Sequence, residues 1–149
     1  MLAYDYFAIQ NLMHRYCLLV DTADFDGVGA IFAKAELNYS MGGPVFRHDP
    51  VAIAETLRQS VRVYPDNGTP QTRHVCTNII IEPDGDEAAR AQSSMIVFQA
   101  APDLALQPII GGRYHDRFSK AGGSWHFTHR RFEADLIGDL SAHLTGATP

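Results

Sequence analysis

Four long runs in the second half of the chain constrain its fold more than any other feature. Each run reads as one continuous strand of at least ten residues, against about 5–6 for an ordinary strand. The runs are Thr72–Glu82, Glu87–Ala100, Pro108–Ser119 and Ser124–Asp135. Hairpin-turn residues fill 83–86 and 121–123, and a longer apolar connection spans 101–107. This order predicts an antiparallel meander, and strands of this length favour a strongly curved sheet.

The first half of the chain carries helical periodicity instead. Apolar residues recur at three- and four-residue spacing in the first helical segment. Asp24 is placed as the N-cap of a second helix, and Asp49 with Pro50 opens a third. The predicted elements of this half are helices at 4–22, 24–32 and 49–63 and a short strand at Glu36–Met41.

Helices followed by a meander are typical of the α+β class. We therefore predict a cone-shaped α+β barrel, in which about three N-terminal helices pack on a curved, mainly antiparallel sheet. The chain has 149 residues, of which 46% are hydrophobic, enough for a single domain over residues 1–149 with one core. A curved sheet closed by helices leaves a pocket between the two layers.

Composition excludes several classes of function. The net charge is -5 and the basic residues form no run, so nucleic acid is not an expected partner. No apolar stretch approaches the roughly 20 residues that span a bilayer, and no signal-peptide layout is present, so we expect a cytoplasmic location. There is no phosphate-cradling glycine loop and no C-x-x-C motif. The seven histidines are scattered, so neither a metal nor another cofactor is expected.

Alternation along the predicted strands assigns side chains to faces. Tyr114 and Asp116 share the side of Pro108–Ser119 that we predict to be concave. On the last strand, Trp125, Phe127 and Arg131 share a face, and its aromatic part suits a pocket wall. Both faces of Thr72–Glu82 are mixed, which fits a sheet with helices on one side and a partner subunit on the other. We therefore expect a homo-oligomer, either a dimer or a trimer.

Two titratable residues stand out from their surroundings. Asp21 ends an apolar helix face, where the partial negative charge of the helix C-terminus disfavours a carboxylate. His74 lies inside a strand among apolar neighbours. The alternatives are an exposed turn residue for Asp21 and an ordinary core or surface histidine for His74. We predict that the two side chains meet in the pocket, directly or through one water.

Several motifs together resemble the SnoaL-like, nuclear-transport-factor-like cone family. Tyr16, then Asp21-Thr22-Ala23-Asp24-Phe25-Asp26, then Ile31-Phe32 match the family's opening of Y, D-x-x-D-[WF]-D and I-F. Thr72–Asn78 resembles its R-H-x-x-x-N strand, and Gly111–Tyr114 and Ser124–Phe127 resemble its late G-x-Y and W-x-[IF] strands. The resemblance covers nearly the whole chain and is closest in pattern to scytalone dehydratase and bile-acid dehydratase.

The resemblance implies a cofactor-free cone that binds flat aromatic or polycyclic compounds. In scytalone dehydratase an aspartate, a histidine and pocket tyrosines carry the elimination of water, and by position these correspond to Asp21, His74 and Tyr39. Tyr16 matches a tyrosine that takes part in the bile-acid enzyme. Ser93 stands where the fungal dehydratase has a second histidine, so scytalone itself is not the expected substrate. The expected substrate-binding residues are Tyr114, Ser93, Asn78, Trp125, Phe127 and Arg131.

The chemistry follows from these residue types. A histidine titrates near neutral pH and can take a proton next to a carbonyl, a carboxylate can orient it, and tyrosine hydroxyls can donate to the enolate. We predict a dehydratase, or an isomerase or cyclase, acting on a small hydrophobic carbonyl compound. The alternatives are a non-catalytic binding or scaffold cone, an epoxide hydrolase, and the small subunit of a ring-hydroxylating dioxygenase.

Overall fold

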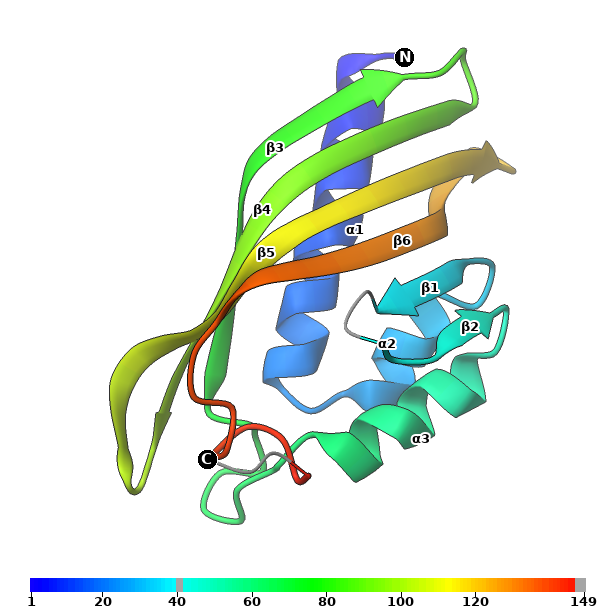
Figure 1. Ribbon diagram of the computed structural model, residues 1–149. Helices are drawn as coiled ribbons and strands as arrows, with labels where there is room; N and C mark the ends of the chain where they lie inside the picture. The colour runs from blue at the N-terminus through cyan, green and yellow to red at the C-terminus, as the bar shows by residue number, and fades with distance from the viewer. Residues whose placement is uncertain (40–41, 147–149) are drawn as a thin grey trace.

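The computed structural model describes residues 1–39 and 42–146. Its three helices are α1 (Ala3–Asp21), α2 (Phe25–Ile31) and α3 (Pro50–Ser60), and two short strands, β1 (Glu36–Tyr39) and β2 (Val45–Arg47), lie between α2 and α3. The long strands are β3 (Thr72–Pro83), β4 (Ala88–Ala101), β5 (Leu104–Ala121) and β6 (Ser124–Ile137). Figure 1 shows α1 crossing one face of the long strands, with α2, α3, β1 and β2 gathered beside one end of it. The predicted α+β class is confirmed.

The six strands form one mixed sheet in the order β2-β1-β6-β5-β4-β3. Every neighbouring pair is antiparallel except β1 and β6, which run parallel. The edge strands β2 and β3 do not pair with each other, so the curved sheet is open, and the helices close the predicted cone. The helices, rather than a closed ring of strands, cover the inner face of the cone.

The capping residues in the sequence correctly predict where α2 and α3 begin. The side chain of Asp24 accepts a hydrogen bond from the Gly27 backbone N–H, and that of Asp49 accepts one from Ala52, both at 2.9 Å, as N-caps do. The apolar stretch 101–107 is not a long connection, because β4 and β5 continue into a hairpin. The strand predicted for Glu36–Met41 is observed for Glu36–Tyr39, while residues 40 and 41 lie outside the described residues.

Several register shifts interrupt the alternation of side chains on the long strands, and two of them affect predicted site residues. On β3 the pairing shifts between Thr77 and Ile80, and Asn78 there has a positive φ of 51°. On β6 the pairing shifts between Phe127 and His129, which makes Thr128 the extra residue. Because an extra residue exchanges the two faces of a strand, every side chain beyond a bulge points to the side opposite to strict alternation.

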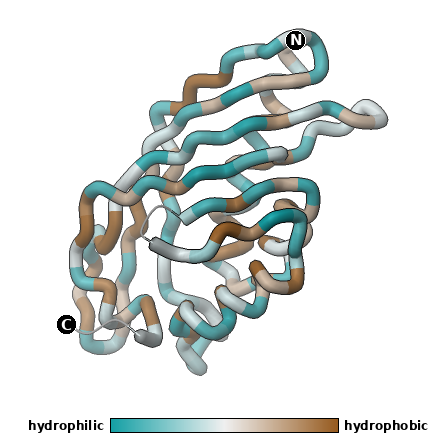
Figure 2. Tube along the Cα trace, turned by 45° about the vertical axis from the view of Figure 1, so that its right-hand side comes forward, coloured by the Kyte–Doolittle hydropathy of each residue, from teal (hydrophilic) through white to brown (hydrophobic). Residues whose placement is uncertain are grey.

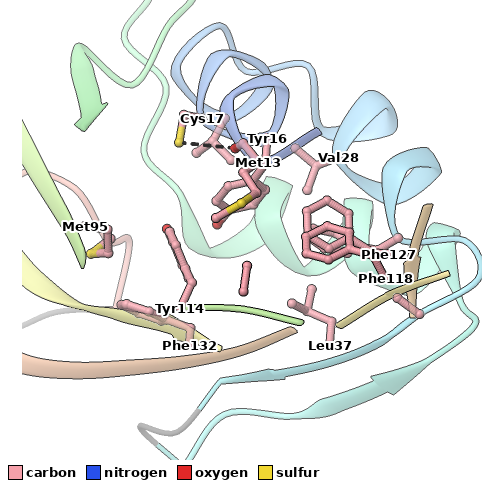
Figure 3. Packing of buried hydrophobic residues seen from close by; sticks show 14 of the residues in the cluster. Met13, Tyr16, Cys17, Val28, Leu37, Met95, Tyr114, Phe118, Phe127 and Phe132 are labelled. Atoms are coloured by element: carbon pink, nitrogen blue, oxygen red, sulfur yellow. Dashed lines mark hydrogen bonds between the residues drawn. The ribbon is translucent and has the colours of Figure 1, made fainter. Parts of the chain in front are cut away.

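The core lies between α1 and the inner face of the sheet. Figure 3 shows Tyr16 of α1 facing Tyr114 and Phe132 of the sheet, while Phe118 and Phe127 pack near Val28. In Figure 2, hydrophobic residues also gather at the bent end of the sheet near the β4–β5 hairpin. There Leu106 and Leu136 are 74% and 69% exposed, so this apolar surface is not covered within one chain.

Candidate active site

A cavity of about 310 Å³ opens between the helices and the inner face of the sheet. This volume is near the lower end of the roughly 300–1,000 Å³ that small-molecule pockets occupy. Its polar groups are the side chains of Tyr16, Tyr39, Tyr114, His74, His143, Thr56 and Ser60. The rest of its wall is mainly apolar and includes Val20, Leu57, Val61, Met95, Val97, Ile110, Phe132, Leu140 and Leu144. An apolar wall with a few polar groups is typical of a small-molecule pocket.

Asp21 and His74 are in direct contact at this cavity. Asp21 is the last residue of α1, and His74 is near the start of β3, so the packing of the helix on the sheet edge brings them together. The Nδ1 atom of His74 is 2.7 Å from Oδ1 of Asp21, and the His74 backbone N–H donates to Oδ2 at 2.9 Å. The Thr72 hydroxyl donates to Oδ1 at 2.7 Å. Three donors therefore hold the carboxylate on the sheet.

These hydrogen bonds determine the charge of Asp21. Burial by itself raises the pKa of this carboxyl, but the hydrogen bonds and charge of His74, together with the bond from Thr72, outweigh burial and leave the pKa lowered. The ionised carboxylate accepts a hydrogen bond from the N–H at Nδ1 of His74. In the neutral ring the proton is therefore on Nδ1, and Nε2 is the nitrogen with a free lone pair. The His74 side chain, which lines the cavity, is thus oriented as a base.

Three tyrosines lie together on the wall of the cavity. Burial raises the pKa of Tyr16, Tyr39 and Tyr114 well above the ordinary value, so all three stay neutral phenols. The rings of Tyr16 and Tyr114 meet edge to face with centroids 5.8 Å apart. The rings of Tyr16 and His74 meet edge to face with centroids 6.3 Å apart. Neutral phenols beside a base are suitable hydrogen-bond donors for an oxygen atom that gains negative charge.

A buried ion pair behind the tyrosines was not predicted. The guanidinium of Arg130 donates from Nε and Nη2 to the two carboxylate oxygens of Asp116, at 2.7 and 2.6 Å, and Arg130 is only 1% exposed. Its charged group lies 4.6 Å from the ring centre of Tyr16 and 4.1 Å from that of Tyr114. Although burial lowers the pKa of Arg130, the charge and hydrogen bonds of Asp116 raise it overall, so the arginine stays charged.

Arg131 does not reach the cavity, because the bulge at Thr128 exchanges the faces of β6. Arg130 and Phe132 point inward, while Arg131 lies on the outer face with its Nη2 atom 3.2 Å from Glu133. The prediction that Arg131 shares a face with Trp125 and Phe127 is therefore wrong. Strict alternation correctly places Asp116 on the inner face of β5. If the bulge at Thr128 is taken into account, the same rule also places its partner Arg130 on that face.

Four other predicted substrate-binding residues also lie away from the cavity. Asn78 is exposed at the bulge of β3, and Ser93 is buried beneath the cavity wall, where its Oγ accepts from Cys76 at 3.3 Å. Phe127 packs in the core against Phe118, with ring centroids 4.7 Å apart. Trp125 donates from Nε1 to Asp5 at the start of α1, at 2.8 Å. Of the predicted substrate-binding residues, only Tyr114 lines the cavity.

Over 1–39 and 42–146, no group of three or more histidine, cysteine or acidic side chains is arranged to hold a metal ion. Burial raises the pKa of the Cys17 thiol to about 12, which keeps it protonated. Within the same residues, no helix is both long and apolar enough to cross a membrane.

The fold and the cavity beneath its helices define a class of small α+β cones, and comparison with known proteins agrees. Residues 3–131 match the SnoaL-like domain family, and the chain belongs to it. No curated protein sequence matches the chain.

Solved structures share the fold at low sequence identity. Rv3472 from Mycobacterium tuberculosis, of unknown function, is 28% identical over 90% of this chain and 73% of its own, with a TM-score of 0.72. A cystatin-like protein from Nostoc punctiforme, also of unknown function, is 20% identical over 94% and 98% of the two chains, with a TM-score of 0.75. A protein from Novosphingobium aromaticivorans, provisionally named a scytalone dehydratase, is 21% identical over 91% and 87%, with a TM-score of 0.71.

Proposed function

We propose that the protein is a cofactor-independent dehydratase or isomerase acting on a small hydrophobic carbonyl compound. The observation that carries this proposal is the contact between His74 Nδ1 and an ionised Asp21, 2.7 Å apart, on the wall of an otherwise apolar cavity. A buried histidine oriented by a carboxylate is an arrangement suited to general acid–base chemistry. The provisional name of the Novosphingobium relative is in keeping with this class of reaction.

The proposed reaction begins with removal of a proton from the carbon next to the carbonyl. His74 takes this proton through Nε2, and the electron pair of the broken C–H bond moves toward the carbonyl oxygen. The hydroxyls of Tyr16, Tyr39 or Tyr114 donate to that oxygen, and Asp21 stabilises the imidazolium. For dehydration, the C–O bond at the next carbon then breaks, and the leaving hydroxide takes the proton back from His74 as water.

The size of the cavity favours a substrate of one or two rings. A volume of about 310 Å³ leaves little space for a four-ring compound, since pockets for larger ligands extend to roughly 1,000 Å³. A suitable test compound is 3-hydroxy-1-tetralone, which has two fused rings and loses water to give the fluorescent product 1-naphthol. Deuterium exchange into 1-tetralone reports the proton abstraction alone, without any leaving group.

The decisive experiment compares wild type, His74→Gln and His14→Gln in both assays. We expect His74→Gln to lose about 10²–10⁴-fold in rate, since this is what a positioned acid–base group contributes. His14 is exposed on α1 and has no role in the site, so its variant should keep wild-type rates. Equal rates in all three proteins would rule out His74 as the base.

A second candidate is a non-catalytic binding protein built on the same pocket. The apolar wall and small volume of the cavity would serve such a role equally well. It would be favoured if 1-tetralone bound to the cavity without any deuterium exchange above the rate in buffer.

We also propose that the native protein is a homo-oligomer. Support comes from exposed apolar side chains on the sheet, with Ile80 62% and Leu136 69% exposed. Light scattering should give a mass above 16.5 kDa at micromolar concentration, whereas a stable particle of 16.5 kDa would contradict the proposal.

A further inference from the structure

A second histidine, His143, reaches the same cavity from the end of the described chain. It lies in the segment 140–146 that follows β6, which we call the C-terminal strap, and it is 9% exposed. Its Nδ1 atom is buried and has no hydrogen-bond partner among the described residues. The chemistry assigned to Asp21, His74 and the tyrosines does not use this residue.

The strap is firmly attached to the wall of the cavity on both sides of His143. The Arg62 backbone N–H donates to the His143 carbonyl at 2.8 Å, and the Thr145 N–H donates to the Ser60 carbonyl at 2.9 Å. On the other side, the hydroxyl of Tyr64 donates to the Ala142 carbonyl at 2.7 Å. The backbone of the strap is therefore part of the fold, and the imidazole lies at a defined place beside the cavity.

The surroundings of His143 keep its ring neutral. The pKa of His143 is lowered to about 4, mainly by burial and also by the charge of His74, while Asp21 acts in the opposite direction. A neutral imidazole carries its proton on one nitrogen and a lone pair on the other. At neutral pH this ring therefore offers one donor and one acceptor without a charge.

The two histidines of the cavity differ in what determines their tautomers. Asp21 holds the proton of His74 at Nδ1, whereas no described group bonds to Nδ1 of His143. Either nitrogen of His143 can therefore carry the proton, and the ligand can decide which. Such a ring can donate to a carbonyl oxygen or accept from a hydroxyl group.

We propose that His143 is a ligand-recognition residue whose imidazole hydrogen bonds to an oxygen atom of the bound ring compound, either a hydroxyl or a carbonyl. The cavity then binds oxygenated ring compounds better than the matching hydrocarbons, and part of that preference depends on His143. This inference rests on the proposed use of the cavity as a ligand pocket, but not on catalysis by His74.

The test measures binding rather than turnover. The probes are 2-naphthol, 1-tetralone and naphthalene, which share two fused rings and differ in a hydroxyl, a carbonyl and no oxygen. In wild type we expect both oxygenated probes to bind more tightly than naphthalene. In His143→Phe the ratio of dissociation constants should fall about tenfold, which is the value of one hydrogen bond. His143→Gln, which keeps a donor and an acceptor, should restore part of the preference, and His14→Gln should behave as wild type.

Nitrogen NMR of histidine-labelled protein gives a readout that a merely structural role would not change. On addition of 1-tetralone or 2-naphthol, the ring nitrogens of His143 should shift in opposite senses, because one probe accepts and the other donates. Naphthalene should leave the tautomer of His143 unchanged.

Three results would overturn the proposal: an unchanged preference in His143→Phe, unshifted His143 nitrogens while a probe occupies the cavity, or no binding of any probe at millimolar concentration. Failure of the proposed function looks different. In that case His74→Gln keeps its deuterium-exchange rate, or wild type shows none, while the preference set by His143 remains.

Discussion

Two buried carboxylates lie between the same helix and the same sheet, but one is paired with an arginine and the other with a histidine. Asp116 is 2% exposed and faces the guanidinium of Arg130, which aromatic rings enclose. Asp21 is 7% exposed and contacts His74 and Thr72 beside an open cavity. The charge of an arginine is permanent, whereas the proton of a histidine can leave. The first pair can therefore only hold charge in place, and the second can move a proton.

Tyr16 connects the two pairs. Its ring meets that of His74 edge to face, and its face lies 4.6 Å from the guanidinium of Arg130. Burial raises the pKa of Tyr16 and of Tyr114, and the charge of Arg130 offsets part of that rise. The fixed positive charge thus makes these phenols better hydrogen-bond donors, and Tyr16 lies between this charge and the His74–Asp21 pair.

The largest expected effect concerns the Arg130–Asp116 pair. Arg130→Met leaves the Asp116 carboxylate buried without its partner, and this should cost about 3–5 kcal/mol in the free energy of unfolding, measured with urea. The double variant Arg130→Met/Asp116→Leu removes both charges and should recover most of that loss. If Arg130→Met lost less than about 1 kcal/mol, as exposed ion pairs do, the Arg130–Asp116 pair would not be shielded from solvent.

Asp21→Asn should affect turnover more than folding. The amide has the shape of the carboxylate but no charge to stabilise the imidazolium, so we expect about 10²-fold slower conversion of 3-hydroxy-1-tetralone. That loss corresponds to roughly 2.7 kcal/mol in the activation barrier. Binding of naphthalene serves as the control, because it should not change. Full activity in this variant would make Asp21 a purely structural carboxylate like Asp116.

The pH dependence of stability should reveal a smaller effect of the same carboxylate. The pKa of Asp21 is lowered by folding from its ordinary value of 3.8, so its ionised form stabilises the fold above about pH 4. This contribution is lost as pH falls through the folded-state pKa. The difference in unfolding free energy between wild type and Asp21→Asn should therefore shrink as the pH falls below about 4, where wild type loses the ionised carboxylate. A difference that grew over this acidic range would have the wrong sign.

Features encoded by neighbouring residues could be predicted from the sequence. The caps at Asp24 and Asp49 depend on residues three positions away, and the class of fold follows from the order of periodic segments. The approach of Asp21 and His74 could be inferred from an unfavourable helix-end position together with the family resemblance.

The missed features depend on long-range packing. No glycine or other local sequence signal marks the bulge at Thr128. Strict alternation therefore predicted Arg131, instead of Arg130, on the inner face of β6. Asn78 did carry a signal, since asparagine is one of the few residues that adopt a positive φ readily. His143 lies beyond the last predicted strand, where no periodicity indicates which wall the segment covers.

The smallest expected effect tests the exchange of faces on β6 directly. Arg131→Met makes the same chemical change as Arg130→Met one residue along the strand. Because Arg131 lies on the outer face and pairs with Glu133 in contact with solvent, its removal should change the unfolding free energy by no more than about 0.5 kcal/mol. Turnover of 3-hydroxy-1-tetralone should stay within about twofold of wild type. If strict alternation held on β6, the two variants would exchange roles, with Arg131→Met the costly change and Arg130→Met the harmless one. A pair of urea titrations under identical conditions therefore decides which arginine neutralises Asp116, independently of any assumption about substrate.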